Sequence, residues 1–299
     1  MSKAELLLVG AGPVGCLLAS ALMQNSVCFD WYIRNTHVRA MAQSLQLQFP
    51  GELLSLSQTC VRYPASLPQA KYSTVITAAK SQQTENLMAG LPLATHARRL
   101  AVANGLISGD YHLGLLYGGA FLDGARLVTR RSNTLQIGSL GSIVDESGYF
   151  GGLLACEWLW IEVVEDVELL QWHKLCLNCV LNPLTALLDV PNGRMLEYLE
   201  GPLIRGLVHE LQLVARRHLG RRWQYDDESI MAGVRALIEV TADNSSSMRE
   251  DLRHHRVPEI SRMNGAIARL GRDYDIPCPL NDAISELVIA VSANSVDSG

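Results

Sequence analysis

The stretch "ELLLVGAGPVGCLLASALMQ", residues 5–24, decides the fold of the first half of the chain. It joins a short apolar strand, a glycine turn and a helical pattern. Gly10, Gly12 and Gly15 follow the spacing G-x-G-x-x-G, in which the first glycine permits a tight turn, the second admits a phosphate to the backbone, and the third lets helix pack on strand. Because the motif follows a strand and opens a helix, it favours a nucleotide site over a structural glycine turn. The residues expected at the phosphates are Gly10, Ala11, Gly12, Pro13, Val14 and Gly15.

The next strand, expected in "VCFDWYIR" (27–34), should end near the ribose of a bound dinucleotide. Asp30 is about the right distance from Gly10 to bind the ribose of NAD, but the apolar run continues to Ile33 and places Asp30 inside the strand. Arg34 stands at the tip, where an arginine favours the 2′-phosphate of NADP. The pattern predicts NADP(H) as the cofactor; the alternative for Arg34 is an exposed loop residue.

The strands and helices alternate beyond this point, which predicts an α/β domain of Rossmann type with a doubly wound parallel sheet. Lys80 and Asn104 stand just past the carboxyl ends of two strands, at the edge where such sheets bind ligands. Residues 123–166 are expected to supply the last strands and the passage to a second domain. The further strands are expected at 72–80, 98–105 and 111–119, with a helix after the first.

The second half has a helical pattern, so the sequence predicts two domains, 1–166 for the cofactor and an all-α domain at 167–299. A chain of 299 residues is long enough for two cores. Asn281 is expected to be the N-cap of the last helix, after the break "IPCP". The helices are expected at 168–189, 200–219, 227–241, 248–273 and 281–293.

The composition favours a globular enzyme and argues against nucleic-acid and membrane proteins. Hydrophobic residues make up 48% and charged residues 18%, which suits a soluble globular enzyme. A net charge of -5 argues against a nucleic-acid partner, and the basic run at 216–222 is interpreted as a solvated helix end. The sequence has no apolar run of the ~18 residues that a membrane span needs, and it starts directly in a strand. We therefore expect a cytoplasmic protein without membrane contact.

Seven scattered cysteines are then expected to be reduced thiols. Cys176 and Cys179 form a C-x-x-C, which raises zinc or redox chemistry as an alternative. Zinc normally needs a second pair of ligands, and a redox pair normally sits at a βα turn rather than in an apolar helix. We interpret both as core residues and predict no metal.

A polar stripe interrupts the apolar helix expected at 168–189. Lys174, Asn178 and Asn182 recur at intervals of four and therefore share one face, with Pro183 next and Asn192 in a following turn. Burying an unpaired amine or amide costs about 1–3 kcal/mol or more, so the stripe predicts a polar ligand rather than a solvent-facing surface.

A second polar grouping lies in "TADNSSSMREDLRHHRVPEI" (241–260). Asn244 and Ser247 precede a helix there, and Glu259 follows further along. Ser247 fits equally well as a helix cap.

With both groupings in view, the sequence resembles the ketopantoate reductase family, which reduces 2-oxopantoate (2-dehydropantoate) to pantoate with NADPH on the way to pantothenate and coenzyme A. The resemblance covers nearly the whole chain. It rests on "GAGPVG" (10–15), "KLCLNCVLNPLTALLDVPNG" (174–193) and "SSSMREDLRHHRVPEISRMNGAIARLGRDYDIPCPLN" (245–281). It implies that the second domain is of the 6-phosphogluconate dehydrogenase-like helical type, that the substrate is a small 2-oxo acid, and that a homodimer is compatible with the fold.

The resemblance also implies roles for single residues. Lys174 takes the place of the catalytic lysine, and Glu259 that of the glutamate near the cofactor and the reacting centre. The substrate positions implied are Asn104, Lys174, Asn178, Asn182, Asn192, Asn244 and Ser247; the cofactor positions are Gly10 to Gly15, Arg34, Lys80, Asn104 and Glu259.

The sequence departs from the family between residues 118 and 138, where a longer strand and loop are replaced by a shortened segment. No cofactor contact is carried over there. Two alternatives stay open: a reductase of another branched 2-oxo acid, and a non-catalytic NADP-binding regulator, which would have no need of the polar stripe.

Overall fold

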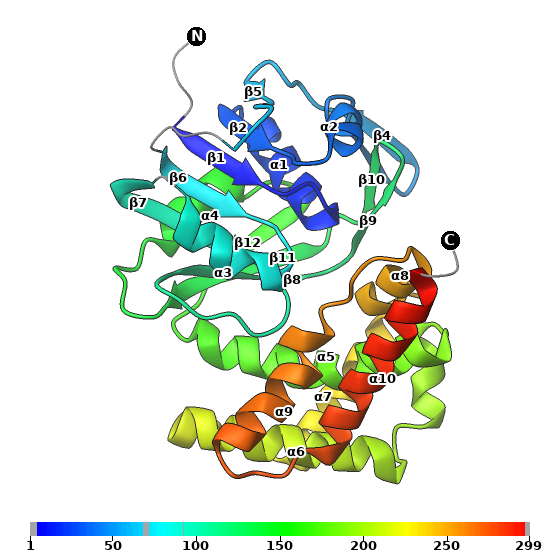
Figure 1. Cartoon of the computed structure of the whole chain (residues 1–299). Helices are drawn as coiled ribbons and strands as arrows, with labels where there is room; N and C mark the ends of the chain where they lie inside the picture. The colour runs from blue at the N-terminus through cyan, green and yellow to red at the C-terminus, as the bar shows by residue number, and fades with distance from the viewer. Residues whose placement is uncertain (1–4, 68–71, 92, 297–299) are drawn as a thin grey trace. The chain divides into compact units, whose positions relative to one another are not determined.

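The computed structural model describes residues 5–67, 72–91 and 93–296. The chain divides into two compact units, Met1–Val167 and Glu168–Gly299. The first combines strands and helices, and the second is helical (Figure 1).

The main sheet of the first unit has eight strands in the order β12-β11-β8-β7-β6-β1-β2-β5. Neighbours pair in parallel except β8 and β11. The predicted parallel sheet is thus confirmed for most of its strands, and one antiparallel pair makes it mixed. Its strands are β1 (Leu6–Val9), β2 (Phe29–Tyr32), β5 (Val61–Arg62), β6 (Tyr72–Thr77), β7 (Leu93–Val102), β8 (Tyr111–Tyr117), β11 (Asn133–Leu140) and β12 (Leu159–Val163).

The antiparallel β8–β11 pair has a local cause. Between these strands the chain makes a hairpin instead of a helical crossover, and parallel pairing needs a crossover. The hairpin belongs to a second sheet of four strands that the sequence did not predict, in the order β4-β3-β10-β9. Its strands are β3 (Gln46–Phe49), β4 (Glu52–Ser55), β9 (Ala120–Asp123) and β10 (Arg126–Thr129).

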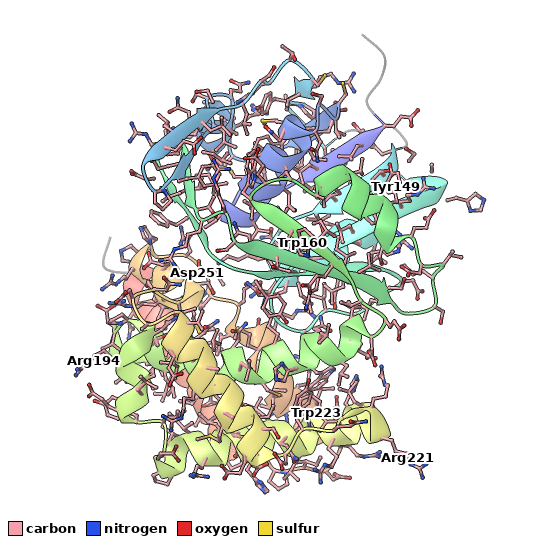
Figure 2. The ribbon with its side chains drawn as sticks, turned by 180° about the vertical axis from the view of Figure 1, so that it is seen from behind. Tyr149, Trp160, Arg194, Arg221, Trp223 and Asp251 are labelled. Atoms are coloured by element: carbon pink, nitrogen blue, oxygen red, sulfur yellow. The ribbon has the colours of Figure 1, made fainter. Side chains whose placement is uncertain are left out.

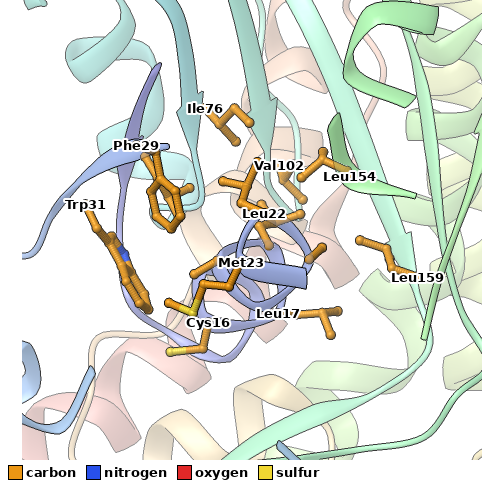
Figure 3. Close-up of a cluster of buried hydrophobic side chains, with 14 of the residues drawn as sticks. Cys16, Leu17, Leu22, Met23, Phe29, Trp31, Ile76, Val102, Leu154 and Leu159 are labelled. Atoms are coloured by element: carbon orange, nitrogen blue, oxygen red, sulfur yellow. The ribbon is translucent and has the colours of Figure 1, made fainter. Parts of the chain in front are cut away.

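Helix α1 (Pro13–Gln24) lies at the centre of the core of the first unit. Its residues from Gly15 to Met23 are buried without exception, which explains the apolar pattern after the glycine turn. Leu17 and Leu22 are fully buried among side chains from several strands, including Phe29, Ile76 and Val102 (Figure 3). The other helices of this unit are α2 (Thr36–Ala42), α3 (Ser81–Gly90) and α4 (Ser147–Leu154).

The second unit confirms most of the expected helices. They are α5 (Val167–Leu188), η1 (Asn192–Glu197), α6 (Pro202–Leu219), η2 (Gly220–Arg222), α7 (Asp227–Val240), α8 (Ser247–Arg253), η3 (Ile260–Arg262), α9 (Asn264–Asp273) and α10 (Pro279–Val296). The basic run at 216–222 ends α6 as expected, and Arg221 extends away from the ribbon (Figure 2).

Two predictions in this half are wrong. The expected helix 248–273 is broken into α8, η3 and α9, because His255 adopts a left-handed φ of 51° and Pro258 cannot continue a helix. Asn281 is not the N-cap of the last helix. Helix α10 begins two residues earlier at Pro279, and Asn281 is fully buried inside its first turn.

Within the described part of the chain, none of the helices is both long and apolar enough to cross a membrane.

Candidate active site

The glycine-rich turn joins β1 to α1 in the first unit. Gly10 has a φ of 104°, and a Cβ there would lie 2.6 Å from the Ala78 carbonyl oxygen; a Cβ on Gly15 would collide with the Gly10 carbonyl. Gly12 differs, because a Cβ on it would meet nothing within 4 Å. Two of the glycines are therefore required by packing, while Gly12 faces open space, where a phosphate could approach the backbone.

Helix α1 presents its amino end at this turn. Gly12 is the N-cap and Pro13 occupies the first turn, which holds no acidic residue. Gly12 and Pro13 are exposed, so the positive end of the helix is open to an anion.

A buried tryptophan, Trp31, is hydrogen-bonded to the glycine turn. The indole of Trp31 is fully buried and donates a hydrogen bond of 2.8 Å to the Gly10 carbonyl oxygen. In the sequence, Trp31 was recognisable only as an apolar residue of the expected strand, and its contact with the turn was not predicted. The bond gives the Gly10 carbonyl a buried donor and so helps to fix the orientation of the turn.

Two charged residues near the end of β2, Asp30 and Arg34, are the candidates for contact with the ribose of a dinucleotide. Asp30 lies inside β2, is buried, and accepts hydrogen bonds from Arg62 Nε and from the Tyr72 hydroxyl, both at 2.5 Å. Burial, followed by the hydrogen bond to Asp30, raises the pKa of Tyr72. Asp30 is thus committed to structure, as its place in the strand predicted. Arg34 follows the strand and is exposed.

Lys80 and Asn104 follow β6 and β7, which pair in parallel. Both side chains are half-buried. Because the carboxyl ends of parallel neighbours meet at one edge, Lys80, Asn104, Arg34 and the glycine turn lie along the same edge of the sheet.

In the second unit, Lys174, Asn178 and Asn182 share one face of α5. The intervening helix faces are buried, with Cys176 and Cys179 fully enclosed. Lys174 and Asn178 remain half-buried, and Asn182 is 9% exposed. Two of the three stripe side chains are therefore partly accessible, and the third, Asn182, is buried.

Desolvation by the surrounding protein lowers the pKa of Lys174 to about 8, and the nearby Glu259 carboxylate opposes part of that shift. Glu259 is half-buried and stands at the start of η3. The structure thus brings together two residues that are 85 positions apart in the sequence, an amine poised to lose its proton near neutral pH and a carboxylate.

The segment 244–247 is anchored to α5. Ser246, not Ser247, is the N-cap of α8: its hydroxyl accepts from the Arg249 amide at 3.2 Å and from the Thr185 hydroxyl at 2.8 Å. Interpreting Ser247 as a cap is wrong by one residue. Because the cap falls on Ser246, Ser247 is left exposed, as is Asn244.

Asn192 has a structural partner. Its side-chain amide donates to the Thr241 hydroxyl at 2.9 Å, and its backbone amide donates to the Asn244 carbonyl at 3.0 Å. Its Oδ1 is buried and has no protein partner among the described residues. Only this oxygen is therefore open to a further donor.

Two arginines clamp an aspartate at the end of α5, a contact that was not predicted from the sequence. Asp189, with a φ of 51°, accepts hydrogen bonds from Arg249 Nε at 2.9 Å and from Arg253 Nε at 2.7 Å. These bonds lower the pKa of Asp189 to about 2. The clamp ties α8 to α5, and its only signal was the run of arginines after Ser247.

Cys176 and Cys179 are free, fully buried thiols. Burial raises the pKa of Cys176 to about 12 and that of Cys179 well above its usual value. Neither thiol is poised to ionise, which fits the interpretation as core residues.

The second unit matches a known protein family, and the chain is similar in sequence to known reductases. Residues 166–292 match the family model "Ketopantoate reductase PanE/ApbA C terminal". A 2-dehydropantoate 2-reductase of Archaeoglobus fulgidus is 25% identical over 297 residues, or 96% of this chain and 97% of that protein. A 2-dehydropantoate 2-reductase of Yersinia pestis is 31% identical, but the match spans only 56% of this chain and 53% of that protein.

Solved structures share the fold. A PanE/ApbA family ketopantoate reductase from Ralstonia eutropha JMP134 has a TM-score of 0.81 at 23% identity, covering 97% of this chain and 99% of that one. D-mandelate dehydrogenase, in a ternary structure with NADH and anilino(oxo)acetate, has a TM-score of 0.83 at 20% identity with the same coverage.

The chain thus combines a glycine turn at a sheet edge, an arrangement typical of nucleotide-binding domains, with a helical unit. More particularly, residues 166–292, which make up most of the helical unit, belong to the ketopantoate reductase PanE/ApbA family.

Proposed function

We propose that this protein reduces 2-dehydropantoate (ketopantoate) to pantoate with NADPH, as a step of pantothenate and coenzyme A synthesis. The observation that carries the proposal is Lys174, whose depressed pKa and neighbouring Glu259 suit a proton donor to a keto oxygen. The full-length relative from Archaeoglobus fulgidus, a 2-dehydropantoate 2-reductase, supports the choice of substrate.

The first unit would hold the cofactor. The amino end of α1 and the open face at Gly12 suit the pyrophosphate, and the exposed Arg34 suits a 2′-phosphate. Lys80 and Asn104 would line the nicotinamide side. When bound, the nicotinamide supplies the hydride.

The second unit would hold the keto acid. The Lys174 ammonium would donate a hydrogen bond to the keto oxygen, stabilise the charge that develops there, and transfer its proton. Asn178, Asn182 and the exposed pair Asn244 and Ser247 supply neutral donors and acceptors for a carboxylate and a hydroxyl. The Oδ1 atom of Asn192 suits the substrate hydroxyl.

A reductase of another 2-oxo acid is the second candidate. The likeness in fold to D-mandelate dehydrogenase, solved with NADH and anilino(oxo)acetate, favours it, since one scaffold can serve more than one substrate. A non-catalytic NADP-binding regulator is a weaker alternative, because it needs neither Lys174 nor its shifted pKa.

The test is to follow NADPH oxidation with ketopantoate and with a panel of branched and aromatic 2-oxo acids. The highest kcat/KM is expected for ketopantoate. A higher value for another acid would move the assignment to the second candidate, and no turnover with any of them would favour the regulator.

Arg34→Ala is expected to raise KM for NADPH about tenfold or more, the cost of a charged hydrogen bond, with little change for NADH. The parent should prefer NADPH. Arg221→Ala, which removes an exposed arginine of the second unit, is the matched control and should leave both values unchanged. Equal use of both cofactors by the parent would contradict the role of Arg34.

Reduction is expected to slow as pH rises through about 8, the pKa of Lys174, because only the ammonium form can donate a proton. The measurement is kcat/KM against pH. Since the Glu259 charge raises this pKa, Glu259→Gln should shift the inflection to lower pH. A flat profile through this range would exclude Lys174 as the proton donor.

A further inference from the structure

Pro183 lies inside helix α5, directly after Asn182, the last residue of the stripe. A proline has no amide hydrogen, so the carbonyl four residues earlier, that of Cys179, loses its helical donor. Cys179 is fully buried, where a carbonyl without a partner is costly. Helix α5 nevertheless continues through Pro183 to Leu188.

Asn264 replaces the missing donor. Its side-chain Nδ2 donates to the Cys179 carbonyl oxygen at 3.0 Å, and the side chain is fully buried. Asn264 is the first residue of α9, so the hydrogen bond joins two helices that are far apart in the sequence.

A buried relay fixes which end of the Asn264 amide faces Cys179. Glu210 accepts from the Leu280 and Asn281 backbone amides, both at 3.0 Å, and from Asn281 Nδ2 at 2.8 Å. Because a carboxylate only accepts, Asn281 must turn its NH₂ group to Glu210 and its Oδ1 to Asn264. Asn264 Nδ2 donates to that oxygen at 3.0 Å, so the same nitrogen serves Cys179.

We propose that Asn264 is a positioning residue for the catalytic helix: it supplies the hydrogen bond that Pro183 removes, and so aligns the turns bearing Asn178 and Asn182. Cys179 and Pro183 each directly follow one of these amides in the sequence. The repair of the helix stands on contacts alone, whereas its consequence for turnover rests on the proposed function.

A double-mutant cycle tests the repair without any substrate. Asn264→Leu leaves the Cys179 carbonyl unpaired and should lower Tm by about 5–10 °C in the parent. Pro183→Ala returns the backbone N–H to the helix. In that background the same Asn264→Leu change should lower Tm by about half as much or less. Any packing loss at Asn264, and the lost contact with Asn281, are common to both backgrounds and cancel.

Equal losses of Tm in the two backgrounds would overturn the proposal. Should Asn264→Leu yield no folded protein, recovery of folding in the Pro183→Ala double variant would support it. Asn264→Ala, which places a smaller side chain, provides the same cycle in that case. Failure of every Asn264 variant to fold in both backgrounds would count against the proposal, since the restored backbone N–H of Pro183→Ala would then not compensate.

Kinetics supply the second readout. Asn264→Leu should lower kcat for the keto acid about tenfold or more, as misplaced groups do, while affinity for NADPH stays within about twofold. Pro183→Ala should restore most of the loss. If the parent reduces no keto acid, the proposed function fails but the thermal cycle still decides the role of Asn264. An active parent in which Asn264→Leu leaves kcat unchanged would restrict Asn264 to stability.

Discussion

Replacing Lys174 with alanine is expected to lower kcat/KM for ketopantoate by about 100-fold or more, as the loss of a positioned acid and electrostatic stabiliser does. The substitution removes the only amine of the stripe on α5. Affinity for NADPH should scarcely change, because the glycine turn and Arg34 belong to the other unit. Steady-state kinetics together with a cofactor titration measure both effects on the same preparation.

Lys174→Gln is the matched control. Glutamine keeps a hydrogen-bond donor but has no transferable proton, so it should rescue substrate binding more than turnover. A folded Lys174→Ala variant that works within a few-fold of the parent would make the lysine structural. The proton donor would then have to be sought elsewhere, with Glu259 as the next candidate.

Gly12→Val is expected to weaken NADPH binding by about 10- to 100-fold, equivalent to losing one or two charge-assisted hydrogen bonds. The backbone of Gly12 has a φ of -71°, which any residue adopts, and its Cβ would enter open space. Folding should therefore survive while the new side chain fills the place of the phosphate. Calorimetric titration measures the affinity, and thermal unfolding without cofactor measures the stability.

Gly15→Ala supplies the contrast within the same turn. Its Cβ would collide with the Gly10 carbonyl, so this variant should lose stability as well as affinity. If Gly12→Val bound NADPH as tightly as the parent, the phosphate site would have to lie away from the turn.

The parts of the fold that the sequence predicted correctly depend on local patterns. The glycine turn, the apolar helix after it and the strand ends at Lys80 and Asn104 follow from neighbouring residues alone. The stripe on α5 is also local, because residues four apart share a helix face whatever packs around them.

The features that escaped prediction depend on contacts between distant segments. The second sheet pairs β3 with β10, about 80 residues further along, and neither short strand has a strong pattern of its own. Asn281 looked like a cap because asparagine favours that place, yet its amide is bound to Glu210 instead. Ser246 and Ser247 are equivalent by sequence, and only the contact with Thr185 distinguishes them.

The hydrogen bond from Trp31 to the Gly10 carbonyl places a fluorescent side chain against the glycine turn. The indole is shielded from solvent and is hydrogen-bonded to the turn itself, so its fluorescence should respond to a shift of that carbonyl. Because the chain has five tryptophans, the difference in fluorescence between the parent and a Trp31→Phe variant on addition of NADPH would isolate the response of this turn without a label or a turnover assay.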